Sequence, residues 1–195
     1  MSPEEVIRRM AEALDQAQIP YMLTGSFASS YHGTPRSSND IDFVVAPTAE
    51  QLRALRQVFR ESEYYFDLED ALEALRLKRQ FNVIDLASGW KIDFIIRKAR
   101  PFSHAEFERR FRTEVAGTSI VFATAEDVIL AKLEWAKLSD SERQIEDVAG
   151  ILRVQGHSLD QEYIRHWVTD LHLETQWSEA VRLAGMTSRP GRSDD

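Results

Sequence analysis

The chain has 195 residues, a net charge of −8 and 43% hydrophobic residues, which suits one globular domain with a small appendage and excludes a disordered or collagen-like protein. No stretch approaches the roughly 20 consecutive apolar residues that a membrane-spanning helix needs, so no membrane partner is expected. The N-terminus carries acidic residues where a secretory signal would carry Lys or Arg, which predicts a cytoplasmic location. The absence of cysteine excludes disulfides, thiolate zinc sites and a cysteine nucleophile.

Capping signals predict where several helices begin. Ser2–Glu5 forms a capping box with proline at the first helical position, and Thr48–Gln51 forms a second box. Ser103–Glu106 has the same spacing and predicts a third helix start. Two further helices are expected over 27–31 and 68–77, from apolar residues at helical spacing.

Short apolar runs bounded by turn residues predict the strands. Ser88-Gly89 separates two of these runs and predicts a β-hairpin. From Thr124 onward, apolar residues recur only at helical spacing, so this part of the chain is expected to be all helical. The predicted strands cover 21–23, 41–45, 81–84, 90–96 and 120–122.

These elements predict a mixed α/β part followed by a helical part, with the division near residue 123. Residues 1–123 are expected to form the α/β core and 124–186 a helical subdomain. Residues 187–195, rich in Ser, Arg, Pro and Asp, are predicted to be a disordered tail.

Positive charge is concentrated in one segment of this acidic chain. Residues 76–112 contain ten basic and four acidic side chains, a net charge of +6, so the remainder carries −14. A basic region of this kind favours a polyanion such as RNA, because phosphate neutralisation is the part of nucleic-acid affinity that does not depend on sequence. The alternative is a solvated helix face with charged strand ends.

Two acids in the second predicted strand point to metal chemistry. Asp40 and Asp42 alternate with Ile41 and Phe43, so both carboxylates project from one face of the strand. Two such carboxylates repel each other and one would take up a proton, so the arrangement requires either a buried Lys or Arg or a divalent cation. Oxygen ligands of this kind suit Mg²⁺ or Mn²⁺. Alone, the pair is equally compatible with a turn residue and an exposed strand acid.

A third acid, Asp93, lies in the apolar run Ile92-Asp93-Phe94, where an ionised side chain is costly without a partner. If its strand neighbours 41–45, Asp93 lies beside the first two acids. Three carboxylates can hold two metal ions for in-line phosphoryl or nucleotidyl transfer. Gly25-Ser26, at a strand-to-helix turn, would then offer close backbone approach and donors to phosphate.

The stretch Leu23–Val45 resembles the nucleotidyltransferase superfamily, which includes DNA polymerase beta and antibiotic nucleotidyltransferases. The likeness rests on Gly25-Ser26, Arg36-x-Ser38 and Asp40-Ile41-Asp42, and is greatest toward a bacterial branch near the abortive-infection (AbiE-type) toxins. In that branch a later helical segment resembles Thr124–Leu133, followed by Arg143-x-x-x-Asp147.

The resemblance implies an α+β fold, in which a small mixed sheet with flanking helices is followed by a C-terminal helical segment. It also implies roles for individual residues. Asp40 and Asp42 would be catalytic metal ligands with Asp93 as the third acid, and NTP would be the substrate. The nucleotide-binding residues would be Gly25, Ser26, Arg36, Ser38 and Lys132. Arg36 could form an ion pair with Asp40 or bind phosphate. Lys132 could instead be an ordinary exposed lysine on a helix.

One departure concerns the last motif. The toxins usually carry a Lys-Asp pair where this chain has Glu146 before Asp147, which weakens any transfer of toxin substrate specificity. Arg143 and Asp147 also have the spacing of an i,i+4 ion pair.

The sequence therefore predicts an enzyme that moves a nucleoside monophosphate from an NTP to a hydroxyl or phosphate on RNA or protein, with a toxin–antitoxin partner as an option. A small-molecule acceptor of the aminoglycoside type is the first alternative. A non-catalytic nucleotide-binding or partner-binding module is the second.

Overall fold

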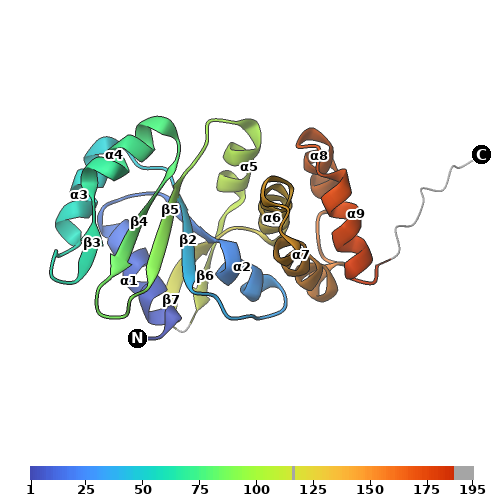
Figure 1. Cartoon of the computed structure of the whole chain (residues 1–195), viewed down its shortest axis with the longest axis horizontal. Coiled ribbons are helices and arrows are strands. Elements are labelled where there is room, and N and C mark those ends of the chain that lie inside the picture. The colour runs from blue at the N-terminus through green and yellow to red at the C-terminus, as the bar shows by residue number, and fades with distance from the viewer. Residues whose placement is uncertain (116, 187–195) are drawn as a thin grey trace, which may run out of the picture. The chain divides into compact units, whose positions relative to one another are not determined.

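The computed structural model describes residues 1–115 and 117–186, and the chain divides into two compact units (Figure 1). The first unit comprises Met1–Ala28 and Ser37–Thr124, and the second comprises Ser29–Arg36 with the chain from Ala125 onward. Residues 29–36 thus belong to the same unit as the helices from Ala125 onward, and the predicted domains 1–123 and 124–186 stay a prediction. The tail predicted at 187–195 lies outside the described residues.

The first unit contains a seven-stranded mixed sheet in the described part of the chain, with strand order β3-β4-β5-β2-β1-β7-β6. Strand β2 runs antiparallel to β1 and parallel to β5, and β4 and β5 form the predicted hairpin. This arrangement confirms the α+β fold class. The strands are β1 Tyr21–Thr24, β2 Asp40–Val45, β3 Tyr64–Phe66, β4 Gln80–Asp85, β5 Lys91–Ile96, β6 Phe111–Val115 and β7 Thr118–Phe122.

Two strands, β3 and β6, were not predicted from the sequence. Each lies at an edge of the sheet and pairs with one neighbour only. β3 has three residues, and the Arg and Glu of β6 break up its apolar pattern. Edge strands bury less surface, so their sequences need less apolar character than central strands.

The helices of the first unit start mostly where capping predicts. The Ser2 hydroxyl accepts from the Glu5 amide at 3.3 Å, and Thr48 heads a complete capping box. The start predicted at Ser103 is wrong: α5 begins at Pro101, because proline is well suited to the first helical turn. The helices are α1 Pro3–Gln16, α2 Gly25–His32 (which continues into the second unit), α3 Ala49–Val58, α4 Leu68–Leu77 and α5 Pro101–Arg109.

A ladder of phenylalanine side chains fixes the register of the central strands. Phe43 stacks on Phe94 with ring centroids 5.8 Å apart, and Phe94 stacks on Phe81 at 5.2 Å. Phe66 extends the ladder to the edge strand β3, 5.7 Å from Phe81. These rings are buried on the core face of the sheet. Helix α4 packs against β4 and α3, and α3 packs against α1 (Figure 1). The opposite face of the sheet carries the residues that alternate with these phenylalanines.

The second unit contains helices α6 Ala125–Ser139, α7 Glu142–Gln155, α8 Gln161–Asp170 and α9 Glu174–Leu183. Buried apolar stripes join them, as their helical spacing predicts. The Tyr163 hydroxyl donates to Asp127 at 2.7 Å and so ties α8 to α6. Within residues 1–115 and 117–186, no helix is long and apolar enough to cross a membrane.

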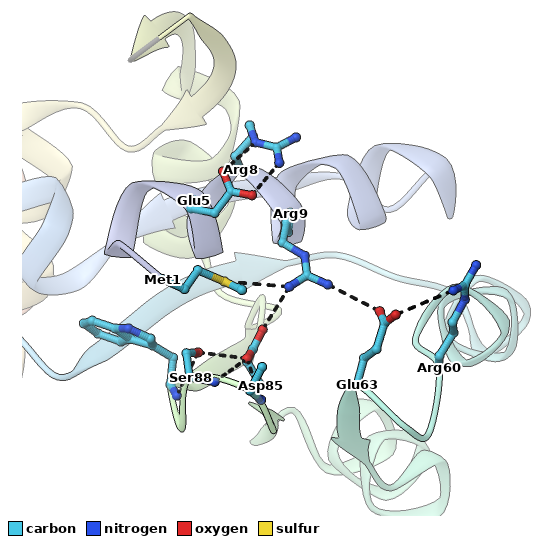
Figure 2. A network of polar contacts seen from close by, with 10 residues as sticks. Met1, Glu5, Arg8, Arg9, Arg60, Glu63, Asp85 and Ser88 are labelled. Atoms are coloured by element: carbon cyan, nitrogen blue, oxygen red, sulfur yellow. Dashed lines mark hydrogen bonds and ion pairs between the residues drawn. The ribbon is translucent and has the colours of Figure 1, made fainter.

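Asp85 ties the β4–β5 hairpin to helix α1 (Figure 2). Its side chain is 1% exposed and accepts from the Ser88 amide and hydroxyl, both at 2.8 Å. Arg9 of α1 donates to the other oxygen at 3.3 Å and also contacts Glu63 at 3.3 Å. The hairpin that carries β5 is therefore anchored by a charge that is almost inaccessible to water.

We predict that Asp85→Ala lowers the free energy of unfolding by about 3 kcal/mol, because buried donors lose their acceptor. For a chain of this length, that loss corresponds to a drop of about 6–12 °C in Tm. Glu73→Ala is the control, since Glu73 is exposed and contacts Arg76 at 3.6 Å. Urea denaturation of both variants measures the free energy of unfolding. Equal losses would show that Asp85 stabilises the fold no more than an exposed carboxylate does.

Candidate active site

A row of polar side chains crosses four strands on the face opposite the phenylalanine ladder. The register pairs Thr24 with Asp42, Asp42 with Asp93, and Asp93 with Asn82. Paired residues on neighbouring strands project from the same face, with Cβ atoms about 5 Å apart. The expectation that β5 neighbours β2 is confirmed, and it places the second and third acids side by side.

Gly25 makes room for Asp42. Its φ of +63° favours glycine, and a Cβ at this position would lie 2.0 Å from an oxygen of the Asp42 carboxylate. Ser26 follows in the first turn of α2 and is half-buried. The predicted Gly-Ser turn thus lies directly against one of the predicted metal ligands.

Asp93 is held by a lysine that the sequence analysis did not single out. Lys91 Nζ donates to one Asp93 oxygen at 2.7 Å. Asp93 is 8% exposed, and its other oxygen is buried with no hydrogen-bond partner among the described residues. The hydrogen bond to Asp93 raises the pKa of Lys91; burial opposes this shift, and the charges of Asp93, Asp40 and Asp42 add to it. One ammonium thus interacts with all three acids.

Asp40 is exposed at the start of β2. The Ser38 hydroxyl donates to the Asp40 backbone carbonyl at 3.1 Å, so Ser38 helps to shape the turn that enters the strand. Asp40 and Asp42 share one face of β2, and Asp40 is the register partner of Lys91.

The donor set suits a hard divalent cation. Carboxylate oxygens are the ligands that Mg²⁺ and Mn²⁺ prefer, and Asp93 offers a buried oxygen without a partner. In the described part of the chain, no group of three or more His, Asp or Glu side chains is arranged so that it could hold a metal ion. Lys91 contributes the positive charge at Asp93 in this structure.

Arg36 and Lys132, predicted to contact nucleotide, share a carboxylate in the second unit. Arg36 donates to both oxygens of Asp147 at 2.6 and 2.7 Å, and Lys132 Nζ donates at 2.7 Å. Lys132 is 4% exposed, so its alternative as an exposed helix lysine is wrong. Burial favours a higher pKa for Asp147, but the hydrogen bonds and charges of Arg36 and Lys132 outweigh it and lower that pKa.

This pairing braces α7 against α6 and the segment before β2. Lys132 also donates to Gln144 at 3.0 Å, which adds a second link between the two helices. Nearby, Gly33 approaches the backbone of α7 so closely that a Cβ would lie 2.7 Å from the Ile151 nitrogen. Arg36 and Lys132 therefore have a structural role in the second unit, while their roles toward nucleotide stay predictions.

Comparison with known proteins bears on the fold. No family model and no curated protein matches the sequence. An antigenic nucleotidyltransferase-like protein from Paracoccidioides brasiliensis aligns with a TM-score of 0.57 at 14% identity, covering 92% of each chain. The antibiotic-resistance factor ANT(2'')-Ia aligns at 0.55 and 15% identity over 93% of this chain and 98% of that one. The lincosamide adenylyltransferase LnuA aligns at 0.52 and 12% identity over 77% and 96%.

The chain therefore shares its fold with these nucleotidyltransferase-like and adenylyltransferase proteins, and at 15% identity or less the likeness concerns the fold alone. Within that fold, sequence reasoning missed Lys91 and Asn82. Both could have been found from strand alternation: Lys91 lies two residues before Asp93, and Asn82 interrupts an apolar run in the partner strand of the hairpin.

We predict that Gly25→Ala destabilises the protein more than backbone strain alone would, and that it weakens metal binding. Alanine at positive φ costs about 1–2 kcal/mol, and the added Cβ must also displace the Asp42 carboxylate. Gly185→Ala is the matched control, because Gly185 has a φ of +73° but open space at its Cβ. Urea denaturation and Mn²⁺ binding are measured for both variants. Similar losses in the two would contradict the role assigned to the Gly25–Asp42 contact.

We also predict that Lys91→Met destabilises the protein in EDTA and makes it more responsive to Mg²⁺. Loss of a partly exposed ion pair costs up to about 1 kcal/mol, or about 2–4 °C in Tm. Added Mg²⁺ then meets three carboxylates without a competing ammonium, so its stabilising effect increases. Thermal denaturation with and without Mg²⁺ measures this, with the exposed Lys98→Met as control. Equal Mg²⁺ responses in parent and variant would show that Lys91 does not compete.

Proposed function

We propose that this protein is a metal-dependent nucleotidyltransferase that moves a nucleoside monophosphate from an NTP to a hydroxyl or phosphate acceptor. The observation that carries the proposal is the register of β2 and β5, which pairs Asp42 with Asp93 beside the strand-to-helix turn at Gly25. A metal-ligand pair and a phosphate-binding turn in one place are what the reaction requires.

Asp40, Asp42 and Asp93 would hold Mg²⁺ or Mn²⁺. Bound metal would neutralise charge on the phosphates and favour the ionised form of an acceptor hydroxyl. The entering cation would weaken the contact between Lys91 and Asp93, because the ammonium and the metal ion would repel each other beside the same carboxylate. Ser26 and the first amides of α2 would donate to the triphosphate of the substrate.

The acceptor class follows from charge. The net positive segment 76–112 supports RNA or protein with an acidic surface as acceptor, because it provides basic side chains in an otherwise acidic chain. A toxin–antitoxin role, with a cognate protein partner, stays a prediction based on sequence resemblance alone. A cytoplasmic location stays a prediction in the same sense.

A small-molecule acceptor is the second candidate. The antibiotic-resistance factor ANT(2'')-Ia and the lincosamide antibiotic adenylyltransferase LnuA share the fold with TM-scores above 0.5. Sequence identity of 15% or less limits this likeness to the fold, so the antibiotic chemistry of those proteins is a hypothesis for this chain.

Asp42→Asn tests the proposed reaction. The amide keeps the shape of the side chain but removes the charge that a metal needs, so we expect loss of NMP transfer and of stabilisation by Mg²⁺ with NTP. At a concentration 100 times Kd, ligand stabilises the parent by about 2.7 kcal/mol. The measurement is Tm with each NTP, in Mg²⁺ and in EDTA, followed by α-labelled NTP incubation with a cell extract.

Asp170→Asn is the control, because Asp170 is an exposed helix carboxylate in the second unit. It should retain both the NTP response and the transfer activity of the parent. A parent protein that no NTP stabilises in Mg²⁺, or an Asp42→Asn variant that responds as the parent does, would overturn the proposal. Label on RNA or protein would favour the first candidate, and aminoglycoside-dependent transfer would favour the second.

A further inference from the structure

Two arginines converge on one aromatic ring at the far end of β5 from the acids. Arg97 directly follows the strand, and its guanidinium carbon lies 5.4 Å from the centroid of the Phe107 ring. Arg110, which caps the end of α5, places its guanidinium carbon 4.1 Å from the same centroid. Phe107 itself is 4% exposed, so the ring is a fixed, buried platform for both cations.

This arrangement brings two like charges together on one ring, and Glu108 is the acid whose charge acts on Arg110. Among residues 1–115 and 117–186, neither guanidinium forms an ion pair with a carboxylate within 4 Å. Burial lowers the pKa of Arg110, the charge of Arg97 lowers it further, and Glu108 opposes the shift. Arg110 also donates to the Phe107 backbone carbonyl, which holds it in place. Arg97 and Arg110 are therefore held close together although their positive charges repel each other.

A phosphate group would offset that repulsion. A guanidinium offers a planar fork of donors that matches phosphate oxygens, and two forks can share one anion or grip successive anions. Both arginines are half-buried, so they retain surface from which to contact a ligand. The exposed Lys98, next along the chain from Arg97, adds a further positive charge.

The position of the pair relates it to the acids. Arg97 lies four residues beyond Asp93, and its amide continues the strand ladder by donating to the Val45 carbonyl at 2.9 Å. Even spacing along a strand places the two residues on the same face, about 13 Å apart at 3.3 Å per residue. A short run of nucleotides could span that distance, whereas a compact acceptor at the acids would not reach the arginines.

We propose that Arg97 and Arg110 form a binding site for the phosphate backbone of a nucleic-acid acceptor strand whose reactive end lies at Asp93. This inference rests on the proposed nucleotidyl transfer for the identity of the reactive end. The site itself is a property of the first unit alone and is independent of bound metal or NTP.

The test is strand binding in EDTA without nucleotide, with a fluorescently labelled single-stranded RNA and a DNA of the same sequence as probes. Fluorescence anisotropy over a range of salt concentrations gives the slope of log K against log salt. Each phosphate contact contributes about 0.7 to that slope for a single strand. R97Q/R110Q should weaken binding and flatten the slope by about 1.4.

R76Q/R79Q is the matched control, because it removes two exposed arginines from the same basic segment. It should bind nearly as the parent does. Parent-like binding by R97Q/R110Q, an equal loss in R76Q/R79Q, or a parent that binds neither probe would overturn the site. Arginine-dependent binding of RNA alone, or of both probes, supports it and shows whether the 2′-hydroxyl matters.

A second set of measurements separates the site from the reaction. If R97Q/R110Q does not fold, R97Q and R110Q singly should each flatten the slope by about 0.7. The folded variants should keep the stabilisation by Mg²⁺ with NTP, which Asp42→Asn loses. A parent that binds the strand through Arg97 and Arg110 but shows no NTP response would contradict the proposed transfer while leaving the phosphate site in place.

Discussion

The phenylalanine ladder on the core face is the constraint on which the candidate site depends. Phe43 and Phe94 are register partners, and both rings are completely buried. Because side chains alternate along a strand, a slip of one residue would turn Phe94 outward and bury Asp93 in the core. The pairing of Asp42 with Asp93 is thus enforced by hydrophobic packing on the opposite face, with no contribution from the carboxylates themselves.

Because the phenylalanine ladder holds Asp42 beside Asp93, their negative charges need a positive charge nearby. Lys91 meets this need in the structure, through its 2.7 Å contact with Asp93 and its attraction to Asp40 and Asp42. Its stem reaches the acids from the same strand, so it can move aside without any change in the sheet. Without a positive charge nearby, the three carboxylates would repel each other and destabilise the fold. The Lys91 ammonium supplies that charge before any metal ion binds.

Strand alternation explains both what the sequence predicted and what it did not. Asp42 and Asp93 stood out because acids are costly within apolar runs, and alternation gave their common face. Lys91 did not stand out, because lysine is common at the exposed start of a strand. The pairing of Arg36 with Asp147 joins residues 111 positions apart, and side-chain contacts of that range leave no local pattern. The assignment of residues 29–36 to the second unit follows from the same distant contacts.

In the proposed complex, the two charged clusters of the first unit contact different parts of the acceptor along one strand. The acids lie at the start of β2 and β5, and the arginine pair lies just beyond the end of β5, anchored on Phe107 of α5. Since a β-strand hardly changes length, the spacing between the two clusters is fixed by the number of residues between them. An acceptor that engages both must carry its reactive group at a set distance from a phosphate. This requirement selects an extended polyanion over a small cation by geometry as well as by charge.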